Sequence, residues 1–93
     1  MNKINICGED IQIDVEHLYL DNNQLTSLPT EIGNLVNLKC LYLYNNKLTS
    51  LPTEIGNLEK LERLGLRNNH IPKEEIEKLK ELLPNCKIDS DYE

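Results

Sequence analysis

The pattern of hydrophobic and polar positions along this chain repeats with a fixed period. Residues 18–37 and residues 41–60 carry the same sequence at all but four positions, at an offset of 23 residues (18 to 41). A period in this range, with leucines at the same offsets in each copy, indicates a repeat architecture in which each copy stacks on the next. The copies differ only at Asp21 and Tyr44, Gln24 and Lys47, Val36 and Glu59, and Asn37 and Lys60.

Each copy predicts one short strand followed by an irregular return. Two leucines flank a single variable residue at 18–20, 41–43 and 64–66, which is the period-2 pattern of a strand with one buried face. A pair of asparagines, which is a turn signal, follows each strand. The rest of the copy has neither strand period nor enough length before its proline for a regular helix. We therefore expect an irregular or 3₁₀ return, and coils of a right-handed superhelix whose strands form a parallel sheet.

The first residues predict a hairpin that covers the start of the first copy. Residues 4–13 alternate apolar and polar positions on both sides of the turn Gly8-Glu9-Asp10. A stacked repeat without a terminal cap leaves open core and an unpaired strand edge, so we expect this hairpin to act as a cap. The side chains expected to share one face of it are Ile4, Ile6, Ile11 and Ile13.

The other end of the chain predicts an amphipathic capping helix. Pro72 near the first helical position and Pro84 just past the last are matching start and stop signals. We expect the charged face of this helix to be solvated. Cys86 and Ile88 are expected to add a last short strand, and residues 89–93 to form a frayed tail. The apolar stripe of helical period comprises Ile76, Leu79, Leu82 and Leu83.

The spacing of the repeat resembles that of the leucine-rich repeat family, in its 23-residue form. The shared pattern is Leu-x-x-Leu-x-Leu-x-x-Asn-x-Leu-x-x-Leu-Pro-x-x-Ile-Gly-x-Leu, and it covers residues 15–71. Two full repeats occupy 15–37 and 38–60, and 61–71 supplies the first half of a third. The ending LLPNCKID looks like the C-terminal cap of small bacterial leucine-rich repeat proteins, notably spirochaete ones, which favours a complete short protein.

This resemblance implies a small α/β fold, a horseshoe-shaped solenoid with the parallel sheet on its concave face. Within one domain over residues 1–93, we expect residues 1–14 to form the N-terminal cap and residues 72–88 the C-terminal helix and short strand. The resemblance also implies a ladder in which one asparagine of each repeat satisfies backbone groups of the turn, as scaffold rather than binding site. These asparagines are Asn23, Asn46 and Asn69.

Composition and charge narrow the classes of function. The net charge is −6 and the sequence pI about 4.9, so the chain has no obvious source of counterion-driven binding to nucleic acid. No apolar run approaches the length of a membrane span, and the N-terminus lacks the apolar segment of a secretory signal. We therefore expect a cytoplasmic protein without nucleic acid or membrane partners. The three cysteines fit a reducing compartment, because Cys7 and Cys86 should lie at opposite ends of the stack.

The residues between the inward leucines are expected to form columns on the open face of the sheet, because stacked strands lie about 4.8 Å apart. Three of the four tyrosines fall in these columns, and exposed tyrosine and arginine are enriched in binding hot spots. We therefore predict a non-catalytic protein-protein interaction module that binds a protein of unknown identity on the concave face. The residues assigned to this surface are Tyr19, Tyr42, Tyr44, Arg63, Arg67, His17 and Asp21.

This face is expected to be polarised. Glu16 and Asp21 place acid toward its N-terminal end, and Arg63 and Arg67 place base toward its C-terminal end, on either side of a notch at Gly65. We expect a partner to set an apolar side chain on the tyrosines and a carboxylate near the arginines. Two alternatives stay open: the tyrosines fill exposed strand positions by propensity alone, or the chain is a structural or self-associating repeat protein. We expect a monomer with at most weak self-association.

Catalysis is the remaining alternative for the same face. His17, Cys40 and Arg63 fall in one column, which is the minimal arrangement for an activated thiolate. A flat sheet, however, offers no oxyanion hole and no group to orient the histidine. We expect no enzyme activity, metal or cofactor, since zinc usually takes about four ligands and Gly33 and Gly56 occur singly. Cys40, on the open sheet, is predicted to be the most reactive thiol.

Overall fold

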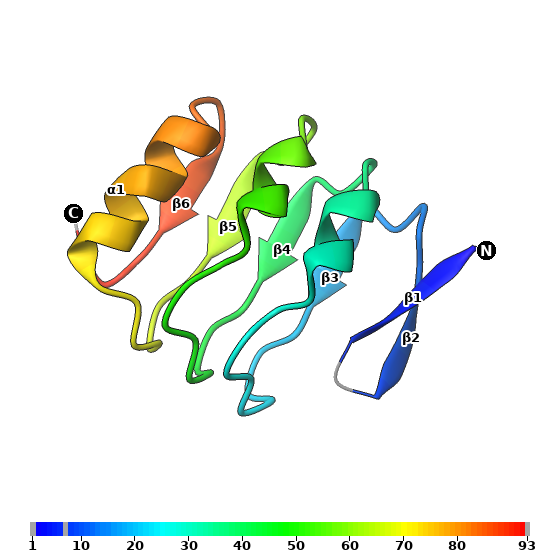
Figure 1. Cartoon of the computed structure of the whole chain (residues 1–93), viewed down its shortest axis with the longest axis horizontal. Helices are drawn as coiled ribbons and strands as arrows, with labels where there is room; N and C mark the ends of the chain where they lie inside the picture. The colour runs from blue at the N-terminus through cyan, green and yellow to red at the C-terminus, as the bar shows by residue number, and fades with distance from the viewer. Residues whose placement is uncertain (1, 7, 93) are drawn as a thin grey trace.

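A four-stranded parallel sheet extends from the N-terminal hairpin to the C-terminal end of the molecule (Figure 1). The computed structural model describes residues 2–6 and 8–92. Each strand pairs with the next strand in chain order. Paired residues are 23 positions apart across the first two strand pairs, as the repeat predicts, and 24 apart at the last, where Arg63 pairs with Lys87. The strands are β3 (His17–Tyr19), β4 (Cys40–Tyr42), β5 (Arg63–Gly65) and β6 (Lys87–Asp89).

The first two returns contain short 3₁₀ helices, η1 (Thr30–Asn34) and η2 (Thr53–Asn57). A proline precedes each of them, and the bonds that follow have the i to i+3 pattern of a 3₁₀ helix. In η1 the Ile32 N–H donates to the Pro29 carbonyl at 3.1 Å, and the Leu35 N–H donates to the Ile32 carbonyl at 3.2 Å. The predicted irregular or 3₁₀ return is therefore confirmed.

The two 3₁₀ helices and the C-terminal helix α1 (Lys73–Leu82) lie on one side of the parallel sheet (Figure 1). The strand leucines point toward them, and Leu41 and Leu64 are completely buried or nearly so. Leucine and isoleucine make up the whole buried cluster. None of the described elements covers the opposite face of the sheet (Figure 1). Because side chains alternate along a strand, that face carries the residues between the leucines.

An antiparallel hairpin precedes the parallel sheet, formed by β1 (Lys3–Ile6) and β2 (Glu9–Gln12). Ile4 lies opposite Ile11, and Ile6 is buried in the main core. The partly buried isoleucines of the hairpin pack against the same core. The predicted apolar face of the hairpin is therefore confirmed, and it joins the hairpin to the first coil.

The turn of the hairpin is tighter than predicted. Ile6 pairs with Glu9, so Glu9 and Asp10 belong to β2 rather than to the turn. Gly8 has a positive φ of 80°, which glycine adopts without steric cost. Its N–H donates to the side-chain oxygen of Asn5 at 3.2 Å, which gives this short connection a local hydrogen bond. Cys7 lies outside the described residues.

The helix α1 packs against η2 with most of its predicted stripe. Ile76, Leu79 and Leu83 are buried, whereas Leu82 is 42 % exposed, so its assignment to the buried stripe is wrong. Six residues after Ile76, Leu82 is rotated about 120° away around the helix. It stands at the edge of the stripe, where it faces Gly56 of η2.

The chain adds β6 after α1, as predicted, and then makes further contacts. Asp89 ends β6, and Ser90 is buried with its hydroxyl donating to the Tyr92 carbonyl at 2.7 Å. The Asp91 carboxylate accepts from the Asn68 N–H at 3.1 Å. In the first two repeats the equivalent N–H groups, of Asn22 and Asn45, donate instead to backbone carbonyls of the following repeat, those of Tyr44 and Arg67. The Asp91 carboxylate replaces such a carbonyl. The expected frayed tail from residue 89 is therefore wrong for residues 89–92.

The asparagine ladder is present in the second and third coils. Asn46 Oδ1 accepts from the N–H groups of Asn23 and Leu25, both at 3.0 Å, and its Nδ2 donates to backbone carbonyls of two successive coils. Asn69 repeats this arrangement one coil later. The side chain of Asn23 is exposed, and the described residues provide no earlier coil whose backbone it could satisfy. Two of the three expected rungs are therefore confirmed.

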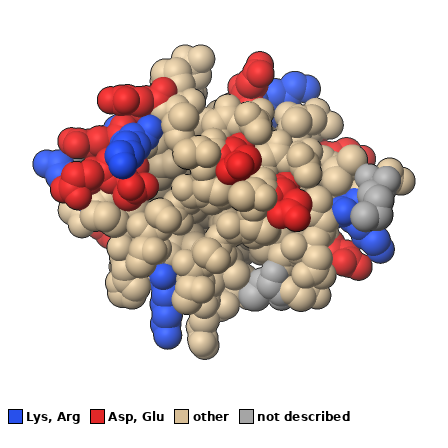
Figure 2. All heavy atoms as spheres, in the orientation of Figure 1, with Lys and Arg blue, Asp and Glu red and all other residues tan. Residues whose placement is uncertain are grey.

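Charged side chains are spread unevenly over the side of the molecule that carries the helices. Figure 2 shows them gathered over α1, whereas the surface over η1 and η2 is mostly uncharged. Within α1, Lys78 Nζ lies 3.4 Å from Glu75 Oε1 in an exposed pair, which is worth little in stability. Among residues 2–6 and 8–92, no helix has both the length and the apolar character that crossing a membrane requires.

Candidate protein-interaction surface

Three tyrosines form a continuous stack across the open face of the sheet. Tyr19 on β3 and Tyr42 on β4 share one register, and their ring centroids lie 5.1 Å apart with an angle of 17° between the planes. Tyr42 also stacks on Tyr44, at 5.9 Å and 22°. Tyr19 is 65 % exposed, so the stack begins at an open ring. We call Tyr19, Tyr42 and Tyr44 the tyrosine stack.

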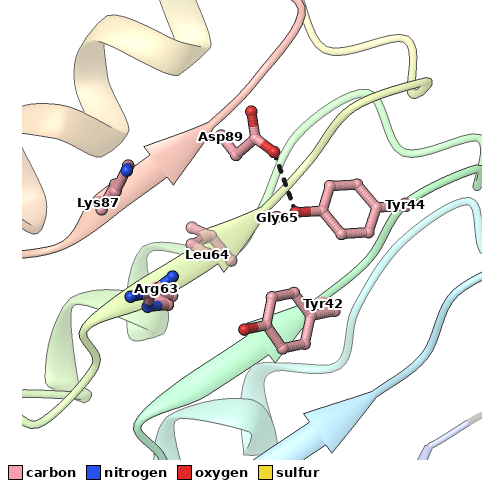
Figure 3. A pocket seen from close by; sticks show the side chains of 7 residues that line it. All are labelled: Tyr42, Tyr44, Arg63, Leu64, Gly65, Lys87 and Asp89. Carbon is pink, nitrogen blue, oxygen red and sulfur yellow. Dashed lines mark hydrogen bonds between the residues drawn. The ribbon is translucent and has the colours of Figure 1, made fainter.

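The tyrosine stack ends over Gly65, where a notch was expected. A Cβ at Gly65 would collide with the Tyr44 ring and lie 2.6 Å from its hydroxyl oxygen. The Tyr44 hydroxyl then donates to Asp89 Oδ2 at 3.0 Å (Figure 3). The Tyr44 ring therefore occupies part of the expected notch at Gly65, and a shallow pocket lined by Gly65 and Arg63, but not by Arg67, remains beside it. The missing side chain makes room for a tyrosine of the same chain.

Arg67 already holds a carboxylate of its own chain. Its Nε donates to Asp89 Oδ1 at 2.6 Å. This bond holds the pKa of Asp89 below its ordinary value, with a smaller contribution in the same direction from the Tyr44 hydroxyl. Asp89 in turn raises the pKa of Arg67, and burial together with Asp89 raises the pKa of Tyr44. Tyr44, which follows β4, and Arg67, which follows β5, are thus both hydrogen bonded to Asp89 of β6.

A shallow pocket of about 240 Å³ lies between the tyrosine stack and the C-terminal strands. Figure 3 shows Tyr42 and Tyr44 on one side of it and Arg63 and Lys87 on the other. Arg63 and Lys87 are register partners on β5 and β6, and both are exposed. Asp89 completes the lining at the end where it bonds to Tyr44.

The acidic end of the face is largely engaged in bonds within the chain. Asp21 Oδ1 accepts from the Tyr44 N–H at 2.8 Å, and the Asp21 side chain is half-buried. Glu16 Oε1 lies 3.6 Å from Lys39 Nζ. The predicted charge gradient is therefore weaker at this end, because one carboxylate is paired with a lysine and the other with the backbone.

Cys40 is less accessible than predicted. It pairs in register with His17 on one side and Arg63 on the other, as expected from the columns, but it is only 8 % exposed. Tyr42, two residues later on the same face, lies close enough for the thiol to raise the pKa of the tyrosine hydroxyl. The expectation that Cys40 lies open on the sheet is therefore wrong. Burial raises the pKa of the other described thiol, Cys86, to about 11.

The described side chains form no metal centre. Within residues 2–6 and 8–92, no three or more histidine, cysteine, aspartate or glutamate side chains are arranged to hold a metal ion. His17 and Cys40 are neighbours in register on β3 and β4. The side chains that the open face carries include the stacked tyrosines and the charged groups Arg63 and Lys87.

The 23-residue coils and the asparagine ladder agree with the result of sequence comparison. A family model described as a leucine-rich repeat region matches residues 13–90. The chain belongs to the leucine-rich repeat family. Membership indicates, in general terms, a protein-interaction module, and proteins of this family are typically non-catalytic. The parallel sheet with short helices is accordingly a small α/β leucine-rich repeat fold.

A solved structure of a leucine-rich repeat protein from Leptospira interrogans is similar to this leucine-rich repeat chain. The two are 51 % identical, with a TM-score of 0.78. The match covers 80 % of this chain and 19 % of the Leptospira chain, so the present chain spans a small part of that protein's length. The predicted resemblance to spirochaete leucine-rich repeat proteins is therefore confirmed. No curated protein sequence matches the chain significantly.

Sequence reasoning missed two residues of the pocket in this leucine-rich repeat protein, Lys87 and Asp89. Both lie beyond the last recognisable repeat, where the register shifts from 23 to 24 residues. The only signal was the predicted strand around Ile88, which places its neighbours on the same face as Arg63. Aligning that strand by its leucine-like Ile88 with Leu64, rather than by a constant period, would have found both.

Proposed function

We propose that this protein is a non-catalytic interaction module that binds another protein through the open face of the sheet β3–β6. The observation that carries the proposal is the tyrosine stack, with two adjacent rings in parallel contact on neighbouring strands and an open ring at Tyr19. Family membership supports the general role, and the residues on the face support its location.

The tyrosine stack has the physical properties of a binding platform. Each ring offers a large contact area that can bury apolar surface, and its hydroxyl keeps a polar handle. Strand backbone and ring-to-ring contact hold Tyr19 and Tyr42 in place before binding, so little conformational entropy is left to lose. Tyr44 contributes differently, because its ring fills the space over Gly65 and its hydroxyl is bonded to Asp89.

The same proposal includes the shape of the molecule. In it, the coils follow a right-handed solenoid with the sheet on the concave side, the hairpin β1–β2 caps the first coil and α1 caps the last. The burial of Ile6 at one end, and of Ile76, Leu79 and Leu83 at the other, supports these cap roles. Both ends would otherwise leave apolar side chains in contact with water.

The test selects ligands for the wild-type chain from a phage-displayed library of random linear peptides and measures their affinity by fluorescence anisotropy. In the Tyr19→Ala/Tyr42→Ala variant, affinity for these peptides should fall by about tenfold or more, as for hot-spot residues. The control, Thr30→Ala/Asn34→Ala, changes exposed residues of η1 and should leave affinity unchanged. Selected peptides that bind the tyrosine variant as tightly as the wild type, or no selected peptides at all, would refute this location of the binding face.

A further inference from the structure

Arg63 and Lys87 form a pair of neighbouring cations beside the tyrosine stack, and neither makes a salt bridge within the described residues. They are register partners on neighbouring parallel strands, so their side chains leave the sheet side by side. Among the described residues, Arg63 and Lys87 have no carboxylate oxygen within 4.0 Å, whereas Arg67, Lys39, Lys3 and Lys78 each have one. Lys47, Lys60, Lys73 and Lys80 likewise have no such contact within the described residues, so what distinguishes Arg63 and Lys87 is that both line the pocket beside Tyr42 and Tyr44.

The one carboxylate of the pocket is already engaged. Asp89 accepts two hydrogen bonds from its own chain. Arg67 Nε donates to its Oδ1 at 2.6 Å, and the Tyr44 hydroxyl donates to its Oδ2 at 3.0 Å. The pocket lining therefore holds two cations, Arg63 and Lys87, and one carboxylate, Asp89, which is already bonded to Arg67 and Tyr44. Figure 3 shows Arg63 and Lys87 across the pocket from Tyr42 and Tyr44, with Asp89 at the far end.

We propose that the pocket at Arg63 and Lys87 receives a glutamate or aspartate side chain of a partner protein. This inference rests on the proposed function and adds the chemistry of the partner. A carboxylate there would accept charge-assisted hydrogen bonds from the guanidinium and the ammonium. An apolar or aromatic side chain of the same partner segment would lie on Tyr19 and Tyr42.

The strand spacing sets the distance between those two partner residues. Tyr19 on β3 and Lys87 on β6 are three strand spacings apart, or roughly 14 Å at about 4.8 Å each. An extended segment advances about 3.3 Å per residue, so this distance corresponds to about four residues. Tyr42 on β4 and Arg63 on β5 are one strand spacing apart, which corresponds to about one or two residues of an extended partner segment. The partner segment should thus carry its acid within about four residues of the apolar side chain.

The test uses the same library of random linear peptides against three proteins. These are the wild-type chain, Arg63→Gln/Lys87→Gln, and the control Lys73→Gln/Lys80→Gln, which removes two exposed charges from α1. Peptides selected by the wild type and by the control should be enriched in an acid within about four residues of an apolar residue. The pocket variant should lose this enrichment and bind wild-type-selected peptides about tenfold or more weakly.

Each other outcome has a defined meaning. If selected peptides depend on Tyr19 and Tyr42 but bind the pocket variant normally, the acidic-partner inference fails and the proposed function stands. If they depend on neither, both fail, and the same holds if the wild type selects no peptide. Phosphorylated peptides, measured with and without inorganic phosphate as competitor, test whether the pocket binds a phosphate group instead of a carboxylate. Binding to phosphorylated peptides alone would overturn the carboxylate assignment. Equal loss in the α1 control would show that net charge alone is responsible.

Discussion

The two 3₁₀ helices have the same sequence, TEIGN, and yet face different neighbours. A Cβ on Gly33 in η1 would lie 2.7 Å from the backbone oxygen of Glu54 and 3.0 Å from its Cβ, in the next coil. A Cβ on Gly56 in η2 would lie 3.4 Å from Cδ2 of Leu82, at the end of a flexible side chain of α1. Identical residues are therefore under different constraints, because the coil that follows η1 presents backbone and the helix that follows η2 presents side chains.

The asparagine ladder shows the same asymmetry in hydrogen bonding. Asn46 is buried and satisfies backbone groups of two coils, whereas Asn23, its exact counterpart in sequence position, is exposed. Each of these side chains bonds backbone groups of its own coil and of the coil before it, and the described residues hold no coil before the one that contains Asn23. In this protein the energetic role of a repeat position is set by the adjacent coil at least as much as by its own residue type.

The largest expected effect comes from removing the neighbour of the last coil. Deleting residues 72–93 takes away the buried Ile76, Leu79 and Leu83, each worth about 1.5–3 kcal/mol in burial. Domains of this kind are stable by only about 5–15 kcal/mol, so we expect the truncated chain to be unfolded or aggregated. Circular dichroism during heating measures this, with Glu77→Ala in the intact chain as control. A cooperative transition near that of the intact chain would contradict a capping role for α1.

The difference between the two asparagines can be tested by comparing the stability of the variants Asn46→Ala and Asn23→Ala. The first leaves the N–H groups of Asn23 and Leu25 and two carbonyls without the side chain that bonds them, and should destabilise the fold by about 3 kcal/mol or more. The second removes an exposed side chain and should cost less than about 0.5 kcal/mol. Urea unfolding measures both. Equal losses would mean that the first and second coils are not distinguished by their neighbours.

The 3₁₀ comparison predicts a smaller difference of the same kind. Gly33→Ala should cost about 1–3 kcal/mol, because the new methyl group meets the Glu54 backbone and one coil must shift. Gly56→Ala should change stability by less than about 0.5 kcal/mol, since 3.4 Å to Leu82 is close to ordinary contact. Thermal unfolding of the two variants against wild type decides it. A larger loss for Gly56→Ala would reverse the comparison.

The sequence predicted most of this fold because its repeat is regular. The strand positions and the 3₁₀ returns follow from a period of 23 that the structure preserves, and the family resemblance implied the rungs at Asn46 and Asn69. Where the period ends, the prediction gave the last strand but not its register or the contacts that follow it. Residues 87–89 continue the sheet with a register of 24, and no local pattern in residues 90–92 indicates that Asp91 replaces a backbone carbonyl.

The candidate surface was predictable in position but not in its contacts. The columns placed Tyr19, Tyr42 and Arg63 on one face, as observed. Side-chain rotamers then determined that Tyr44 fills the space over Gly65 and that Arg67 pairs with Asp89. Such choices depend on space and charge across three strands, and sequence spacing contains no information about them.

The Arg67–Asp89 pair predicts a modest dependence of stability on pH. Arg67 holds the folded pKa of Asp89 below its usual value of about 3.9, so its stabilisation is present above that pH and is lost as the pH falls through the folded pKa. Asp89→Asn should therefore cost up to about 1 kcal/mol at neutral pH, as for an exposed pair, and almost nothing at strongly acidic pH. Urea unfolding at both pH values tests this. A difference that grows in acid would contradict it.

The smallest expected effect compares the equivalent positions His17 and Cys40. His17 lies on the outermost strand of the parallel sheet and is exposed, whereas Cys40 lies between two strands and is buried beside Tyr42. Native Cys40 should therefore react slowly with a thiol reagent, and Tyr42→Ala should accelerate its labelling by opening the space beside the thiol, whereas Tyr19→Ala should have less effect. Mass mapping of labelled peptides over time measures each site.

The same experiment contains an internal reference in Cys86. Its pKa of about 11 leaves little thiolate at neutral pH, so Cys86 labelling should be slow and should rise steeply as the pH approaches that value. Cys40 is limited by access instead, so its acceleration in Tyr42→Ala should appear already at neutral pH. Rapid labelling of Cys40 in the wild-type protein would show that the thiol is open to solvent, and that the second coil does not shield this column more than the first.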